Sequence, residues 1–192
     1  MLKTFLMAVT TLSVLSGCAN TSNTLEINPQ ITLPQADPSL RATTISITGA
    51  DRRNDPVLAK VSRDNRLVDL TASRDMRFLL QESLEKQMTA RGYMIGANGI
   101  VDLQIIVNKL YANVSQGDLR YSINTEADIA IVATAKNGNK QIKNYRQRYS
   151  VQGPFSASNS KITEAVNSTL SGVITDMSQD TSVSDFIKQN AH

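Results

Sequence analysis

The chain has 192 residues, 41% of them apolar, and its 20 basic and 17 acidic residues give a formal net charge of +3. This length suits one domain with a sizeable core, and so small a charge excess does not favour a nucleic-acid partner. A single cysteine excludes a disulfide framework. The only histidine is His192, the final residue given, so we expect neither the usual zinc sites nor histidine-dependent catalysis.

The first 17 residues have the layout of a secretory signal. Lys3 precedes an apolar run over residues 5–15, whose 11 residues fall short of the roughly 20 that span a bilayer. The next residues, "LSGC", resemble the lipobox of bacterial lipoproteins. That resemblance implies cleavage before Cys18, a covalent diacylglycerol on its sulfur and an N-acyl chain on its amino group. We therefore expect residues 1–17 to be removed and the lipids to hold the protein on a membrane.

Residues 18–40 are predicted to be the lipidated N-terminus and a flexible tether, because they contain three prolines and no sustained period. The alternative is that "LEINPQITL", residues 25–33, docks as an edge strand, since its apolar residues alternate and an edge tolerates proline. Residues 41–192 are then expected to form a single α+β domain.

That domain opens with a strand over residues 44–48, where isoleucine alternates with polar residues and Gly49 follows. The charged stretch over residues 51–72 is expected to be a loop, with a hairpin as the alternative. Apolar residues at steps of three or four then predict an amphipathic helix, with Ser73 as its N-cap and Gly92 as its end.

Three β segments follow, over residues 101–114, 119–135 and 140–153, and two turns divide them into an antiparallel meander. The second turn contains Asn137 and Gly138, a pair that favours type I′ geometry. The apolar residues change phase after Val107, which predicts a bulge.

A second helix is predicted over residues 158–180, and a last turn or two from Ser182. The fold class is therefore α+β. We expect an antiparallel sheet, made of the three-stranded meander plus an N-terminal strand or strands, with two main helices packed on one face.

The sequence carries none of the common catalytic motifs. No serine lies in a G-x-S-x-G elbow, and the spacing of Gly92, Gly96 and Gly99 does not match a phosphate-binding loop. We therefore expect no enzyme, no metal and no cofactor other than the covalent lipid on Cys18.

Arg146 and Arg148 are the candidate contact residues, because they share one face of a predicted strand while Tyr145 and Tyr149 lie on the other. Two interpretations stay open. The arginines bind a phosphate or carboxylate of a partner, or they are ordinary residues of a solvated strand face.

Long segments also carry a resemblance to a known family, among them "LSGCAN", "DNRLVDLTASRDMRFLLQESLEKQMTARGYM", "DIAIVATAKNGNK" and "DMSQDTSVSDFIKQNA". Over its whole mature length the chain resembles the YajG family of uncharacterised bacterial lipoproteins. The resemblance implies an envelope lipoprotein with no assigned reaction and carries over Cys18 as the lipid attachment point. In the sorting pattern of related lipoproteins, Ala19 in place of aspartate favours the outer membrane.

The favoured hypothesis is a non-catalytic binding or scaffold module on the periplasmic side, with an envelope protein, glycan or lipid as its partner. The alternative is an accessory subunit of an envelope assembly or transport complex. A hydrolase of cell wall or lipid is a third hypothesis, and it requires a deep cleft with convergent polar groups.

Overall fold

Three long strands form the centre of the computed structural model, which describes residues 22–40 and 43–191. β6 (Val101–Gln116), β7 (Arg120–Ala135) and β8 (Lys140–Pro154) pair in antiparallel order, so the predicted meander is confirmed. The register of β6 and β7 shifts between Val107 and Lys109, which confirms the predicted bulge.

The other edge of β6 pairs with two strands in succession. β2 (Thr44–Asp51) runs parallel to its first half and β3 (Ala59–Arg63) runs parallel to its second half. The remaining strands extend these two as follows: β5 (Met94–Ile95) beside β2, β4 (Arg66–Ala72) antiparallel to β3, and β1 (Thr24–Leu25) parallel to β4.

The sheet is therefore mixed, and the prediction of an antiparallel sheet holds for the meander alone. A connection that includes a helix joins β2 to β6. A crossover of this kind allows two neighbouring strands to run parallel.

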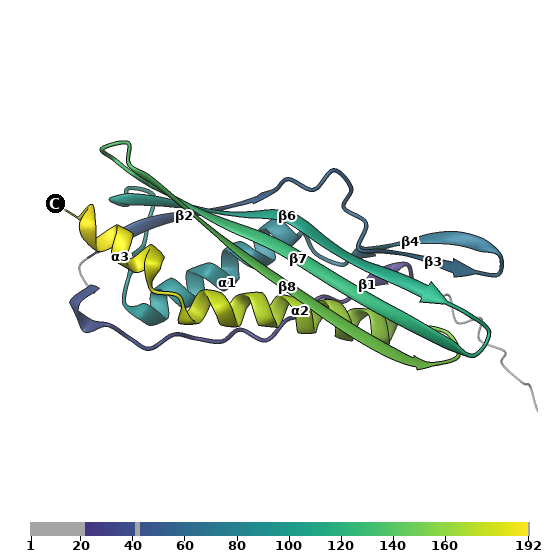
Figure 1. Cartoon of the computed structure of the whole chain (residues 1–192). Helices are drawn as coiled ribbons and strands as arrows, with labels where there is room; N and C mark the ends of the chain where they lie inside the picture. The colour runs from purple at the N-terminus through teal and green to yellow at the C-terminus, as the bar shows by residue number, and fades with distance from the viewer. Residues whose placement is uncertain (1–21, 41–42, 192) are drawn as a thin grey trace, which may run out of the picture.

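Figure 1 shows the helices on one side of this sheet. α1 (Met76–Arg91) packs against β2 and β6, whereas α2 (Asn159–Gln179) packs against β8 and β7. The short α3 (Ser182–Gln189) follows α2, and the 3-10 turn η1 (Pro38–Leu40) precedes β2. The packing of two main helices on one face agrees with the prediction, and the core lies between the two layers.

The capping residues of the helices were predicted with one error. Gly92 ends α1 in the left-handed region at φ 120°, as predicted, and Ser158 caps α2. The N-cap of α1 is Asp75 instead of Ser73, because the Asp75 carboxylate accepts a hydrogen bond from the Arg77 backbone N–H at 2.8 Å.

The stretch over residues 51–72, expected to be a loop, contains the hairpin of β3 and β4 that was the alternative. Asp64 and Asn65, which join β3 to β4, both have positive φ, 47° and 59°, as a type I′ turn requires. At the β7–β8 turn only Gly138 has positive φ, so the type I′ prediction there is wrong.

The N-terminal segment lies along the domain instead of leaving it. Leu25 and Ile27 are only 1% and 2% exposed, and Leu40 is also buried. We call residues 25–37 the N-terminal strap. The prediction of a flexible tether is therefore corrected for residues 22–40. Of residues 25–33, the alternative edge strand, only Leu25 pairs with the sheet, as part of β1 (Thr24–Leu25). Residues 1–17 and Cys18 lie outside the described residues.

Candidate functional site

No helix of the described chain covers the sheet face opposite α1 and α2 (Figure 1). Polar and charged residues of β6, β7 and β8 lie on it, because alternate residues of each strand point away from the core. We call it the outer face. Both candidate arginines lie there, as the alternation in β8 predicts.

Each candidate arginine is held by a carboxylate on the neighbouring strand. The Arg146 Nε donates to Asp128 at 2.6 Å, and an Arg148 terminal nitrogen donates to Glu126 at 3.0 Å. The register places Arg146 opposite Asp128 and Arg148 opposite Glu126. The two side chains nevertheless stay 71% and 79% exposed, so each guanidinium is oriented without being covered.

Lys109 of β6 completes this group. Its Nζ lies 2.7 Å from Glu126, so one carboxylate holds both Lys109 and Arg148. We call Lys109, Glu126, Asp128, Arg146 and Arg148 the outer-face cluster. The bonds from Lys109 and Arg148 lower the pKa of Glu126, and the bond to Asp128 raises the pKa of Arg146.

The chemistry of the outer-face cluster is that of a contact site. It holds three cations against two carboxylates, and each guanidinium has five N–H donors. Arg146 and Arg148 each use one donor group within the described chain, so further donors remain for a carboxylate, phosphate or carbonyl of a partner. Both carboxylates of the cluster, Glu126 and Asp128, are engaged by its cations.

The tyrosines beside these arginines belong to the other face. Tyr145 is 5% exposed under the helices, and its burial, together with nearby Asp180, raises the pKa of its hydroxyl. Tyr149 is 37% exposed and lies on the same side. The predicted division of the strand between arginines and tyrosines is therefore what the structure has.

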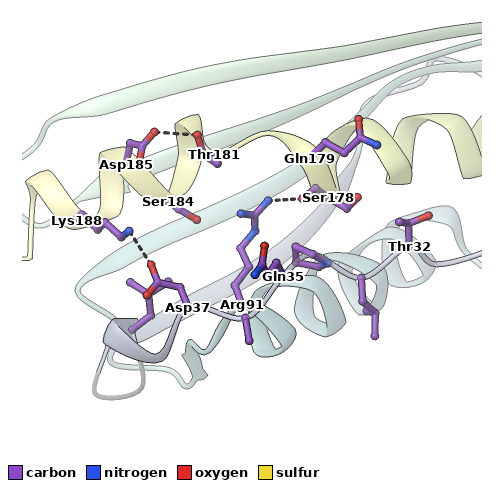
Figure 2. A pocket seen from close by; sticks show the side chains of 14 residues that line it. Thr32, Gln35, Asp37, Arg91, Ser178, Gln179, Thr181, Ser184, Asp185 and Lys188 are labelled. Atoms are coloured by element: carbon purple, nitrogen blue, oxygen red, sulfur yellow. Dashed lines mark hydrogen bonds and ion pairs between the residues drawn. The ribbon is translucent and has the colours of Figure 1, made fainter.

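A second candidate is the groove of about 590 Å³ between the N-terminal strap, the end of α1 and the α2–α3 junction. Figure 2 shows Arg91 reaching from α1 toward Ser178 and Lys188 facing Asp37. An Arg91 terminal nitrogen donates to the carbonyl oxygens of Ser178 and Asp180, both at 2.7 Å. The guanidinium therefore donates to carbonyls at the end of α2 that have no N–H donor within the helix.

The other charges of this groove are also engaged. Lys188 Nζ lies 2.8 Å from Asp37, and bonds from Lys188 and Ser39 lower the pKa of Asp37 to about 2. The groove therefore joins the strap to α1 and α3, and its charged groups are committed to that structural role.

The described residues hold neither a metal-binding cluster nor a membrane-spanning helix. Residues 22–40 and 43–191 contain no group of three metal-ligating side chains. Within the same ranges, no helix has the length and apolar character needed to cross a membrane. His192 and Cys18 lie outside these ranges.

The two arginines were predicted as contact residues, whereas their partners Glu126 and Asp128 were not. The β7–β8 turn gave a misleading signal, because a two-residue turn at Asn137 and Gly138 would set Asp128 opposite Gln147. The observed register is centred on Asn137 and sets Asp128 opposite Arg146. Lys109 had no such signal, since the bulge after Val107 changes which β6 residues reach the outer face.

Comparison with known proteins gives consistent matches. The profile of a family described as "Uncharacterized lipoprotein" matches residues 29–188. Two proteins named "Uncharacterized lipoprotein YajG", from Escherichia coli K12 and Escherichia coli O6:H1, are each 64% identical over 191 residues, covering 100% of both chains. The crystal structure of protein XCC0632 from Xanthomonas campestris has a TM-score of 0.59 at 12% identity and covers 88% of this chain and 99% of its own. That last likeness is one of fold alone.

Proposed function

Because the chain belongs to the YajG family of uncharacterized lipoproteins, we propose that it is a bacterial envelope protein anchored by lipid at Cys18. The "LSGC" motif supports cleavage after residue 17 and acylation of the new N-terminus. One acyl chain gives marginal membrane binding, whereas a diacylglycerol plus an N-acyl chain gives a lasting anchor. Ala19 in place of aspartate supports the outer membrane, and we place the domain on its periplasmic side.

We propose further that the anchored domain is a non-catalytic binding or scaffold module. The observation that carries this proposal is the uncovered outer face, on which Arg146 and Arg148 are oriented by carboxylates yet remain exposed. Oriented guanidinium groups lose less side-chain entropy on binding than free ones. An anionic or carbonyl-rich surface of an envelope protein, glycan or lipid fits these donors.

An accessory subunit of an envelope assembly or transport complex is the alternative within the same class, and a stable protein complex would distinguish it. The hydrolase hypothesis is the least favoured. Its cleft would have to offer carboxylates or nucleophiles free to act, whereas the ionised groups of the 590 Å³ groove bind one another or the backbone.

The decisive experiment purifies the full-length lipidated protein from membranes after brief in-cell crosslinking and identifies co-purifying molecules by mass spectrometry. We expect one near-stoichiometric partner with the native protein. The R146A/R148A double variant should lose at least four-fifths of it. Recovery of a protein partner favours the assembly role, whereas a glycan or lipid favours a solitary binding module.

Arg74→Ala is the matched control, because Arg74 is also exposed and ion-paired, with Glu82 at 2.8 Å, but lies at the start of α1. It should keep the partner. Equal loss in both variants, or recovery of the native protein alone, would contradict a contact site at the outer face.

The anchor is tested separately. Cys18→Ala should abolish incorporation of labelled fatty acid and release the protein from the membrane fraction. A processed, membrane-attached C18A protein without fatty acid would overturn the lipidation proposal.

A further inference from the structure

Three large apolar side chains are more exposed than any others in the described chain. Leu67 is 71% exposed, Leu119 is 80% exposed and Phe155 is 73% exposed. They lie in the β3–β4 hairpin, in the β6–β7 turn and just after β8, respectively. Single exposed apolar residues need no explanation, but a group of them at one place marks a contact surface.

Backbone and side-chain hydrogen bonds place the three at one end of the molecule. The Phe155 N–H donates to the Leu119 carbonyl at 3.0 Å. The Gln116 side chain, at the end of β6, donates to the Ser62 carbonyl at 3.3 Å, and Ser62 is the register partner of Leu67. In Figure 1 this end lies opposite the C-terminus. We call Leu67, Leu119 and Phe155 the apolar tip.

Phe155 is doubly unusual. Its φ of 62° lies in the left-handed region, which is unfavourable for a bulky aromatic residue. Its ring is exposed, so burial within the domain does not offset the cost of this backbone conformation. A strained and exposed phenylalanine is explained most simply by a contact outside the chain.

The described chain also begins at this end. The Asn159 side-chain amide donates to the Ser22 carbonyl at 2.7 Å, and the Asn159 side-chain oxygen accepts from Arg63 of β3. Cys18 precedes Ser22 by four residues, which span at most about 14 Å when fully extended. If Cys18 is acylated as proposed above, its lipids hold this end, and not the opposite one, at the bilayer.

We infer that the apolar tip inserts into the surface of the bilayer that holds the lipid anchor. The inference rests on the proposed lipidation and gives the domain a defined orientation, with the strands rising from the membrane. Charge is a minor attraction, because Arg63, Arg66 and Arg120 at this end stand against Asp64 and Asp118 in the adjoining turns, an excess of one positive charge. The partner is therefore an apolar lipid surface, with no requirement for anionic headgroups.

The absence of tryptophan from the chain permits a direct test. Single variants F155W and L119W of the full-length lipidated protein are reconstituted in phosphatidylcholine vesicles with or without brominated acyl chains. The control is I142W, because Ile142 is 62% exposed on β8 but lies about 40 Å from the tip at about 3.3 Å per residue.

We expect brominated lipids to quench the tryptophan of L119W and of F155W by more than half and that of the I142W control by less than a tenth. In an L67W variant that also carries L119S and F155S, quenching should fall at least twofold relative to L67W alone. Replacing a third of the lipid with phosphatidylglycerol should leave these values unchanged.

The possible failures are distinguishable by vesicle flotation. If the protein floats with the vesicles but the tip variants are quenched no more than I142W, the membrane contact is wrong and the anchor stands. If the protein does not float, both proposals are overturned. A quenching increase that requires anionic lipid would overturn the apolar basis of the contact.

Discussion

The backbone N–H of Asn28 donates to Oδ1 of Asn167 at 2.9 Å, and this bond begins a regular ladder between the strap and α2. Two residues on, Gln30 N–H donates to Ser171 Oγ at 2.9 Å, and Thr32 Oγ1 then lies 2.8 Å from Thr175 Oγ1. Two residues of extended chain advance about 6.6 Å and four residues of helix about 6.0 Å, so the two periods match. The alternate strap residues are thereby turned toward the core.

The first prediction concerns this strap. Ile27→Ala should reduce the free energy of unfolding by about 2–4 kcal/mol, because Ile27 is 2% exposed and its truncation leaves a cavity. Leu33→Ala in the same segment should change it by less than about 0.5 kcal/mol, since Leu33 is 57% exposed. Urea unfolding followed by circular dichroism measures both, and equal, small effects would restore the flexible-tether interpretation.

The second prediction concerns the buried guanidinium at the end of α1. Arg91→Met should lower the free energy of unfolding by about 1.5–3 kcal/mol, because the carbonyls of Ser178 and Asp180 lose a charged donor. Thermal unfolding is the measurement. Exposed Arg74 serves as the control, and an Arg74→Met effect as large as that of R91M would contradict the capping role.

The third prediction concerns Gly99, which approaches the backbone of β2. A Cβ at this position would lie 2.3 Å from the Ser46 nitrogen, so Gly99→Ala must displace backbone and should cost about 1–3 kcal/mol or more. At Gly117 the nearest atom is 3.7 Å away, and Gly117→Ala should be nearly neutral. Chemical denaturation of the two variants decides whether Gly99 serves packing, the role that remains once a phosphate-binding loop is rejected.

The fourth prediction concerns stability in acid. Burial alone raises the pKa of Asp180, but hydrogen bonds from Lys143 and Ser182 outweigh it and lower the pKa to about 2. Because the folded pKa lies below the ordinary 3.8, the stabilisation is complete above about pH 4 and is lost as the pH falls toward 2. Asp180→Asn should therefore flatten the pH dependence of the unfolding free energy between pH 4 and 2.

The partner of Asp180 provides an independent check of that result. Lys143 Nζ lies 2.7 Å from Asp180, so Lys143→Met should flatten the same part of the curve. Lys140 lies on the same strand and forms no ion pair with the described residues, so Lys140→Met should leave the slope as it is. Urea unfolding at several pH values measures all three variants, and an unchanged slope in both D180N and K143M would contradict the assignment.

The sequence by itself determined the elements whose signals are local. The step of three or four residues marks α1 and α2, the left-handed cap requires Gly92, and the phase change after Val107 marks the bulge in β6. The alternation in β8 likewise separated Arg146 and Arg148 from the tyrosines. Each of these signals arises within a few residues, where helix and strand geometry dictate which side chains share a face.

Only the tertiary structure decided which elements meet. Ser46 of β2 lies beside Asp102 of β6, a parallel pairing between distant residues for which neither strand carries a local signal. The alternation of Leu25 and Ile27 suits a sheet edge and a helix-bound strap equally, because both bury every second residue. The choice between them depended on the spacing of Asn167, Ser171 and Thr175 on a helix remote in sequence, and only folding brings that spacing alongside the strap.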